Sequence, residues 1–358
     1  MRTIGVREGE REPTLIEKPR PDPSDGEALV RTLRVGVDGT DHEVIAGGHG
    51  GTPAGDDHLV LGHEAVGQVV DSNGTALSEG DVVVPTVRRP PNGGNEYFEH
   101  GEADMAPEGS YHERGIVGAH GFMAEYFTSP AEDLVRIPAS QADLGFLIEP
   151  ISISEKAFEL AETSRSSFTW EPESALVLGN GSLGLLTLAM LDRDDRYERL
   201  YCLGRRDRPD PTIDIMEDLG ATYVDSRKTP VDRMPEVYEH VDFVYEATGY
   251  ARHPFQSVQA LAPNGVAALL GVPGPGEFEV DAGAFHSEMV LHNKAMVGSV
   301  NSGRRHFEAA SRSLLELPRR FLDDLVTGVY DVSEFERAFD DGDTVIKTAV
   351  EFGTYEER

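Results

Sequence analysis

The chain has 358 residues, and its 64 acidic side chains against 32 lysines and arginines give a formal net charge of −32. A hydrophobic fraction of 39% supports packed cores, and because a chain of this length exceeds what one core usually organises, two domains are expected. Residues 1–8 lack the apolar centre of a signal peptide, and no apolar run reaches the roughly 20 residues that span a bilayer. We therefore expect a cytoplasmic protein without a membrane or nucleic-acid partner.

The distribution of the acidic residues indicates what kind of acidic protein this is. Three interpretations compete: a disordered solvating chain, a nucleic-acid mimic, and a folded protein whose hydrated carboxylates keep it soluble in concentrated salt. The acids are scattered as singles and pairs, and lysine is rare, which favours adaptation to high salt. The single cysteine, Cys202, excludes an intrachain disulfide and a cysteine-rich zinc lobe, and indicates a reducing compartment.

The N-terminal part is predicted to be rich in β-structure. Residues 27–37 and 65–84 contain short valine-rich runs separated by Gly, Asn, Asp and Ser, as in strands joined by tight turns. Residues 88–109 are rich in Pro, Gly, Asn and Glu, and we expect them to form an excursion loop without a regular element.

After Pro150 the pattern changes to alternating helices and strands. A helix expected at 154–162, a strand at 175–178 and a helix at 185–191 begin an alternation that predicts a doubly wound parallel sheet of the Rossmann type, and hence an α/β fold. The chain from residue 301 is expected to be helical, with a strand at 344–352 that returns to the first domain. We therefore predict one domain of residues 1–153 and 301–358 and a second of residues 154–300. Further strands are expected at 200–203, 222–224, 243–247, 266–270 and 295–299, and further helices at 211–219 and 254–261.

A GxGxxG motif marks the candidate nucleotide site. It directly follows the strand at 175–178 and opens the next helix, so its backbone N–H groups can approach a pyrophosphate at the positive end of that helix. A tight turn without a ligand is the alternative, and the strand-turn-helix context favours the cofactor. The motif consists of Gly179, Asn180, Gly181, Ser182, Leu183 and Gly184.

The residues about 20 positions beyond this motif bear on the choice between NAD and NADP. An NAD site places an acidic residue there to bind the ribose hydroxyls. This chain has Gly204, Arg205 and Arg206 instead, and guanidinium groups suit a 2′-phosphate. We predict NADP, with NAD as a weaker substrate; the alternative is that the two arginines pair with surface acids, including Asp207.

Two runs carry a resemblance to a known family. Gly62-His63-Glu64-Ala65-Val66-Gly67, followed by Gly80-Asp81-Val82-Val83, resembles the signature of the zinc-dependent medium-chain alcohol dehydrogenases. The order of a β-rich part, a Rossmann domain and a C-terminal return also resembles that family, so the resemblance covers essentially the whole chain. It implies a GroES-like catalytic domain joined to the Rossmann domain.

The resemblance implies one catalytic zinc ion. Asp38 stands where the family commonly has a cysteine, His63 is the family's histidine, and Glu149 stands at the later ligand position, with water as fourth ligand. This set suits zinc, which takes imidazole nitrogen and carboxylate oxygen. Taken alone, Asp38 and Glu149 are equally compatible with ordinary surface acids.

Two further residues receive catalytic roles from the resemblance. Thr40, two residues after Asp38, would contact the substrate and pass its proton toward solvent; the alternative is a threonine that caps a turn. Glu64 would orient the metal site, or act as a transient ligand when water leaves.

A narrower resemblance is to the archaeal glucose dehydrogenases, in particular to their halophilic branch. It implies that Glu113 and Asn301 hold sugar hydroxyls, that Glu149 and Glu64 also touch the sugar, and that Asn301 borders the cofactor. Since residues 88–112 contain no cysteine, no structural zinc is expected. The resemblance rests on the runs Val37-Asp38-Gly39-Thr40-Asp41, Gly47-Gly48-His49-Gly50, Leu61-Gly62-His63-Glu64, Arg114-Gly115-Ile116-Val117-Gly118-Ala119-His120-Gly121, Leu178-Gly179-Asn180-Gly181 and Gly298-Ser299-Val300-Asn301.

The activity implied is that of a glucose 1-dehydrogenase, which oxidises β-D-glucose at C1 to D-glucono-1,5-lactone with hydride transfer to NADP or NAD. A homodimer, or a tetramer, is implied as well. Another zinc-dependent polyol or alcohol dehydrogenase is the main alternative. A zinc-free quinone-reductase relative is disfavoured by the joint presence of Asp38, His63 and Glu149, and a non-enzymatic acidic binding protein does not account for the nucleotide motif.

Overall fold

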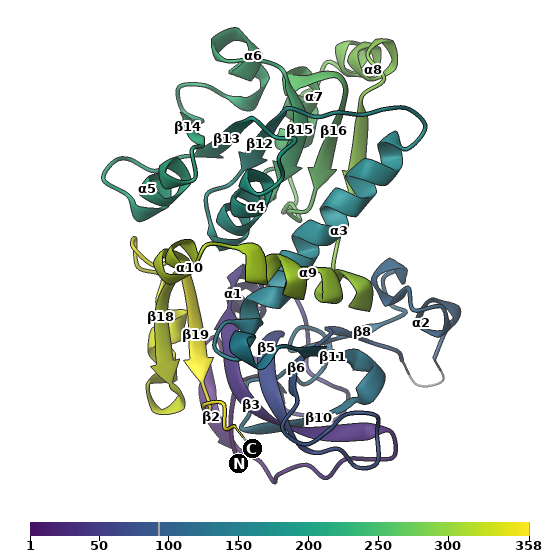
Figure 1. The fold of residues 1–358 in the computed structure, drawn as a ribbon, viewed down its shortest axis with the longest axis vertical. Helices are drawn as coiled ribbons and strands as arrows, with labels where there is room; N and C mark the ends of the chain where they lie inside the picture. The colour runs from purple at the N-terminus through teal and green to yellow at the C-terminus, as the bar shows by residue number, and fades with distance from the viewer. Residues whose placement is uncertain (92–93, 358) are drawn as a thin grey trace. The chain divides into compact units, whose positions relative to one another are not determined.

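The computed structural model describes residues 1–91 and 94–357, which divide into two compact units (Figure 1). Unit 1 comprises Met1–Ser152, Asn301–Leu315 and Val326–Arg358, and unit 2 comprises Ile153–Val300 and Glu316–Leu325. This division differs from the predicted boundaries at residues 316–325, which the sequence assigned to the first domain. The helix α10 (Arg319–Leu325) belongs to unit 2 because it contacts α5 (Pro211–Asp218), where Arg320 pairs with Asp218 at 2.8 Å.

Unit 1 is built mainly from antiparallel strands. The strands are β1 (Arg2–Arg7), β2 (Thr14–Glu17), β3 (Glu27–Val37), β4 (His58–Val60), β5 (Glu64–Asp71), β6 (Val82–Pro85), β7 (Arg88–Arg89), β8 (His112–Arg114), β9 (Gly118–Ala119), β10 (Tyr126–Pro130), β11 (Leu134–Ile137), β18 (Val326–Asp331) and β19 (Lys347–Glu351). The main sheet runs β11-β6-β5-β3-β19-β18, and β10 also pairs with β3. Since β19 sets Thr348 opposite Val37, the end of the chain lies beside the strand that leads to Asp38.

Helices and short 3-10 turns connect these strands. The helices are α1 (Gly39–Ala46), α2 (Glu96–Glu99), α3 (Ile148–Arg165), which continues into unit 2, and α9 (Arg304–Glu316); the 3-10 turns are Ala103–Met105, Ala131–Asp133, Ala139–Gln141, Gly145–Leu147 and Val332–Phe339. The helix expected at 154–162 begins earlier, at Ile148. Pro150 sits in its first turn, where a backbone N–H has no partner within the helix in any case.

The excursion expected at 88–109 is more regular than predicted. It begins with β7, which pairs with β8, and it contains the one-turn helix α2, whose N-cap Asn95 accepts hydrogen bonds from the N–H groups of Tyr97 and Phe98. The prediction of no regular element was wrong because elements this short leave no periodicity in a sequence. Residues 92 and 93 of the excursion lie outside the described residues.

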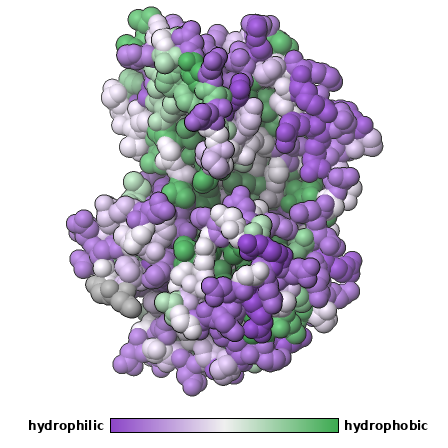
Figure 2. Space-filling model, turned by 180° about the vertical axis from the view of Figure 1, so that it is seen from behind, coloured by the Kyte–Doolittle hydropathy of each residue, from purple (hydrophilic) through white to green (hydrophobic). Residues whose placement is uncertain are grey.

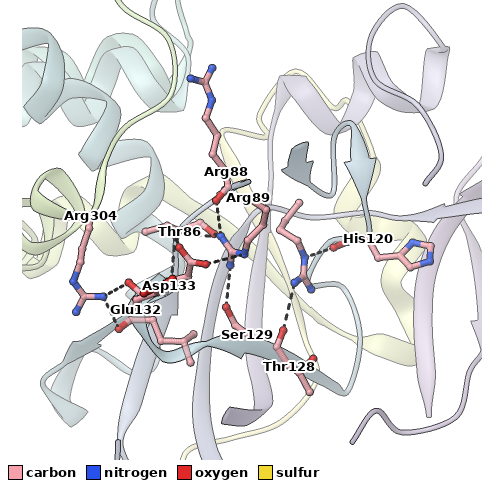
Figure 3. Close-up of polar contacts among 11 residues, drawn as sticks. Thr86, Arg88, Arg89, His120, Thr128, Ser129, Glu132, Asp133 and Arg304 are labelled. Carbon is pink, nitrogen blue, oxygen red and sulfur yellow. Dashed lines mark hydrogen bonds and ion pairs between the residues drawn. The ribbon is translucent and has the colours of Figure 1, made fainter. Parts of the chain in front are cut away.

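Buried arginines hold the backbone around this excursion in place (Figure 3). Arg89 donates a hydrogen bond to Ser129 Oγ at 2.9 Å, and its Nε lies 3.3 Å from the carboxylate of Asp133. Arg114 donates to the carbonyl oxygen of Thr128 at 3.3 Å. Burial, and after it the neighbouring Arg89 cation, lowers the pKa of Arg114 to about 9, while the carboxylates of Glu27 and Asp133 oppose this shift.

Unit 2 is an α/β unit with a parallel sheet. Its strands are β12 (Ser174–Leu178), β13 (Arg199–Gly204), β14 (Thr222–Asp225), β15 (Val241–Glu246), β16 (Leu261–Leu269) and β17 (Ala295–Gly298); its helices are α4 (Ser182–Asp192), α5, α6 (Met234–Val237), α7 (His253–Ala260), α8 (Ala282–Leu291) and α10, with a 3-10 turn at Val231–Arg233. The sheet order β14-β13-β12-β15-β16-β17 is that of a Rossmann fold. The predicted α/β class is therefore confirmed, and the buried side chains of Leu176, Leu203 and Val244 lie in the core beneath the helices.

Packed cores in both units exclude a disordered chain as the explanation of the acidity. Much of the face that Figure 2 shows is hydrophilic, as a surface rich in hydrated carboxylates requires. Within residues 1–91 and 94–357, no helix is both long and apolar enough to cross a bilayer.

Candidate metal and nucleotide sites

Asp38 occupies the N-cap of α1, directly after β3. Its Oδ1 accepts a hydrogen bond from the N–H of Asp41 at 3.1 Å, and a carboxylate oxygen of Asp41 accepts one from the N–H of Asp38 at 3.2 Å. The other oxygen of Asp38, Oδ2, accepts from the Thr40 hydroxyl at 3.1 Å and lies 3.7 Å from Nε2 of His63. Asp38 is thus a helix cap that also presents one oxygen to Thr40 and His63.

His63 is buried, with 4% of the residue exposed, between two carboxylates. Nε2 faces Asp38, and Nδ1 lies 4.0 Å from Oδ1 of Asp41, which also accepts from the N–H of Gly62 at 3.2 Å. Burial disfavours the imidazolium, but the carboxylates of Asp38 and Asp41 outweigh it and raise the pKa of His63 well above its ordinary value. The ring is therefore oriented from both sides by acids.

Glu64, the first residue of β5, forms a buried ion pair with Lys347 of β19. Both side chains are 1% exposed, and the Lys347 ammonium also donates to the carbonyl oxygen of Val37 at 3.1 Å. Glu64 approaches β3 so closely that a Cβ on Gly36 would lie 2.1 Å from its carboxylate, which explains the glycine. Burial raises the pKa of Glu64, and the Lys347 cation opposes this shift.

Glu149 completes the buried group from the first turn of α3. It is 5% exposed, and burial, aided by the carboxylates of Glu64 and Asp38, raises its pKa to about 8 against the opposing effect of the His63 cation. The group thus contains more acids than bases in a volume from which water is excluded.

This donor set fits a divalent metal ion. One ligand atom from each of Asp38, His63 and Glu64 lies within 4.8 Å of the others, and the buried Nδ1 of His63 has no hydrogen-bond partner among the described residues. Imidazole nitrogen and carboxylate oxygens are ligands that zinc accepts, and a dication would stabilise the ionised form of acids whose pKa burial raises. The predicted third ligand, Glu149, belongs to the same buried electrostatic group, so the exact ligand set stays a prediction.

Glu113 and Asn301, the expected sugar contacts, are hydrogen-bonded to each other. Nδ2 of Asn301 donates to Oε1 of Glu113 at 3.1 Å, and Nε of Arg88 donates to the same oxygen at 3.0 Å. Arg88 is itself fixed, because its guanidinium donates to the carbonyl oxygen of Asp104 at 3.0 Å. The structure therefore brings these two residues together in unit 1 and holds the Glu113 carboxylate in place with two hydrogen-bond donors.

In unit 2, β12, a glycine turn and α4 form the arrangement that a pyrophosphate site needs. Gly179 has a φ of +113°, and a Cβ on Gly184 would lie 2.0 Å from the carbonyl oxygen of Gly179, so both positions require glycine. Gly181 is the N-cap of α4 and supplies no side-chain cap, while Ser182 and Leu183 begin the helix. The N–H groups of the first turn are thus available to an anion.

Of the two arginines that follow β13, one forms an ion pair and the other is exposed. Gly204 ends β13, and a Cβ there would lie 2.7 Å from Oδ1 of Asn180. Arg206 lies 3.2 Å from Asp210, so this arginine is paired with an acid, but with a buried one and not with the surface acids that the alternative expected. Arg205 is exposed and forms no ion pair with any residue in the described part of the chain.

Sequence reasoning assigned no role to three residues next to these sites, namely Asp41, Arg88 and Lys347. Asp41 has a sequence signal, since it stands three residues after the N-cap, where a capping box places its acid. Lys347 has a weaker signal, because lysine is rare in this chain. Arg88 has none, because it reaches Glu113 from β7, an element that the sequence does not reveal.

Comparison with known families gives two matches. Residues 24–139 match the alcohol dehydrogenase GroES-like domain, and residues 142–352 match the glucose dehydrogenase C-terminus. Among curated proteins, glucose 1-dehydrogenase of Haloferax mediterranei is 73% identical over 99% of this chain and 100% of its own length. Glucose 1-dehydrogenase of Halobacterium salinarum is 61% identical over 99% of this chain and 100% of its own length.

Solved structures agree with these relatives. The Haloferax mediterranei glucose dehydrogenase in complex with NADP, Zn and gluconolactone matches with a TM-score of 0.98 at 73% identity, covering 99% of this chain and 100% of its own. The 2R,3R-butanediol dehydrogenase from Bacillus subtilis matches with a TM-score of 0.79 over 98% of this chain and 99% of its own, but at 21% identity it shows a common fold alone.

Proposed function

The chain belongs to the glucose dehydrogenases of the zinc-dependent medium-chain dehydrogenase family, and on this basis we propose a role for each of its buried site residues in the oxidation of a sugar. The chain is a zinc-containing, NADP-linked glucose 1-dehydrogenase that converts β-D-glucose to D-glucono-1,5-lactone. The single observation that carries this assignment is the 73% identity, over essentially the full length, to a glucose 1-dehydrogenase. Its acid-rich composition and its haloarchaeal relatives make it a protein adapted to high salt.

The metal site is proposed to consist of Asp38, His63 and Glu149. When bound, zinc acts as a Lewis acid toward the C1 hydroxyl oxygen and NADP accepts the hydride. Asp38 is preorganised for this task because the capping bond from the N–H of Asp41 fixes its carboxylate. Glu64 orients the site rather than leaving its place, since its ion pair with Lys347 holds it against β3.

The sugar is proposed to be oriented by Glu113 and Asn301 and deprotonated through Thr40. The Glu113 carboxylate accepts hydrogen bonds from sugar hydroxyls, and Arg88 holds it in place. The Thr40 hydroxyl, which lies beside Asp38, accepts the C1 hydroxyl proton while releasing its own toward solvent. Holding the reacting carbon in one orientation lowers the entropic part of the barrier.

A sugar panel tests the substrate. In molar KCl, reduction of NADP should be supported by D-glucose and not by sorbitol, threonine or ethanol, because Glu113 and Asn301 recognise ring hydroxyls. Absorbance of NADPH is the measurement. NADP reduction with one of the other compounds and none with glucose would replace this function with that of another zinc polyol or alcohol dehydrogenase.

The preference for NADP is proposed to depend on Arg205, with Arg206 as a second contact. Changing both to glutamate should weaken NADP binding by about 100-fold, because two charge-assisted hydrogen bonds of about 1.5 kcal/mol each are lost. Binding of NAD, which lacks the 2′-phosphate, should change little. Fluorescence titration of both cofactors measures this, and Arg227→Glu serves as a control, since Arg227 is already paired with Asp207 at 2.6 Å. Equal effects on both cofactors would refute the phosphate site.

The homodimer and the cytoplasmic location stay predictions. The homodimer is supported by large apolar side chains that unit 2 exposes, among them Val272, Val290, Leu291 and Val300, which are 79%, 61%, 72% and 54% exposed. Large apolar side chains exposed on a highly charged protein are often found at interfaces between subunits. The molar mass in high-salt solution, by light scattering, tests the assembly.

A further inference from the structure

Outside the metal and nucleotide sites, Lys18 of unit 1 lies between two histidines. It follows β2, and its Nζ lies 3.0 Å from Nε2 of His58 and 2.9 Å from Nε2 of His120. The two rings are stacked, with centroids 5.0 Å apart and an interplanar angle of 22°. Nothing in the dehydrogenase function uses this cluster.

The hydrogen bonds of the histidines fix their tautomers. Nδ1 of His120 accepts from the N–H of Val60 at 3.1 Å, so the ring proton is on Nε2, which faces both Lys18 and the carboxylate of Asp56 at 2.9 Å. Nδ1 of His58 lies 2.7 Å from Oδ1 of Asp57 and donates to it. Nε2 of His58 is therefore an acceptor.

These tautomers are compatible with an uncharged amine at Lys18. Nζ donates one hydrogen to Nε2 of His58 and offers its lone pair to the Nε2–H of His120. An ammonium has no lone pair and would set a donor against a donor at 2.9 Å. Nε2 of His120 lies 2.9 Å from Asp56 as well, so its N–H can bond to that carboxylate instead. The lone pair of Lys18 is then free to react while the rest of the cluster stays in place.

The electrostatic environment acts in the same direction. Burial lowers the pKa of Lys18, and the carboxylates of Asp56 and Asp57 oppose this shift. Burial, the largest cause, lowers the pKa of His120, so its ring stays neutral. Arg114 donates to the carbonyl oxygen of His120, and Figure 3 shows the ring of His120 pointing away from that contact.

We propose that Lys18 is a nucleophilic amine that accepts acyl groups from activated carbonyl compounds, and that a sugar lactone is such a donor. The Nζ lone pair attacks the lactone carbonyl carbon, a C–N bond forms and the ring C–O bond breaks. Nε2 of His58 takes one amine proton and returns it to the leaving ring oxygen, which becomes a hydroxyl. The product is an amide, and no redox step is involved. Only the supply of lactone in the cell rests on the proposed function.

Lys228 of unit 2 is the matched reference within the same chain. Its side chain is 81% exposed and it forms an ion pair with Asp225 at 3.3 Å. Accessibility therefore favours modification of Lys228, whereas nucleophilicity favours Lys18. The ratio of the two modification rates separates these effects without a second protein.

The test uses the full chain with zinc and NADP in molar KCl near neutral pH. The protein is incubated with D-glucono-1,5-lactone, and in parallel with trace acetic anhydride, and peptide mapping by mass spectrometry follows each lysine. With both reagents Lys18 should be modified severalfold faster than Lys228, because an uncharged amine hydrogen-bonded to His58 presents a nucleophilic lone pair, whereas Lys228 is held in an ion pair with Asp225. His58→Gln should reduce this ratio severalfold while glucose oxidation stays unchanged, and Lys18→Arg should remove the adduct.

Equal rates at the two lysines would overturn the proposal, as would an unchanged ratio in a folded His58→Gln chain. If His58→Gln lowers the melting temperature, the proposal is judged only by the ratio of the Lys18 and Lys228 modification rates in the unsubstituted chain. Acetylation of Lys18 without modification by lactone would overturn the assignment of sugar lactones. Because the lactone is added directly, the result does not depend on turnover of glucose. A chain that does not oxidise glucose would therefore refute the proposed function but not the proposal about Lys18.

Discussion

Replacement of His63 by glutamine is expected to remove both the bound metal and glucose oxidation while leaving NADP binding unchanged. His63 is the nitrogen donor of the proposed ligand set, and its ring lies between Asp38 and Asp41. A neutral amide binds zinc poorly, and without a Lewis acid the barrier rises by several kcal/mol. We expect kcat/KM to fall by at least about 1000-fold. Zinc content by mass spectrometry and steady-state kinetics give the two readouts.

The control for this change is His292→Gln. His292 belongs to unit 2, its side chain is 42% exposed, and it lies 3.8 Å from Glu288 one helical turn away. It should keep its zinc and its activity. A His63→Gln chain that retains one zinc ion and oxidises glucose normally would show that the metal is held elsewhere, and His63 would then be a packing residue.

Replacement of Lys347 by methionine is expected to give the largest loss of stability of any single change considered. Glu64 would remain 1% exposed without its cation, and removing one partner of a buried ion pair costs about 3 to 5 kcal/mol. The carbonyl oxygen of Val37 would also lose its donor. Denaturant unfolding in constant molar KCl measures the free energy of unfolding.

The double variant Lys347→Met with Glu64→Gln separates this ion pair from other effects. Neutralising Glu64 removes the uncompensated charge, so the double variant should be more stable than Lys347→Met alone. Arg320→Met, which breaks an exposed pair with Asp218, is the matched control and should change stability by less than about 1 kcal/mol. Equal losses for Lys347→Met and Arg320→Met would contradict the role given to the buried pair.

Much of unit 2 could be predicted from the sequence because its strands are buried on both faces. The apolar run at 175–178 followed by Gly179 predicts β12 and the start of α4, and the structure shows both. The C-terminal strand was also predictable, since 344–352 alternates. Its partner was not, because the pairing of β19 with β3 joins residues more than 300 positions apart in the sequence, and no local pattern records such a contact.

Site residues that belong to a sequence motif could be predicted. Residues that contact the site from a distant part of the chain could not. Asp38, His63 and Glu64 come from two short runs, and the structure places them together. Lys347 neutralises Glu64 from the other end of the chain, and Arg88 fixes Glu113 from a two-residue strand. Pairing of Arg206 with an acid was considered from the sequence, but its partner, Asp210, was not identified, because that partner depends on where α5 begins.

The proposed function depends on a metal ion held by acidic residues and one histidine. Its most direct test is glucose-dependent reduction of NADP in molar KCl before chelation with EDTA, after it, and after zinc is restored. The expected result is full activity, then loss of activity with NADP binding retained, then recovery with zinc. Undiminished glucose oxidation by a chain shown to contain no metal would contradict the account.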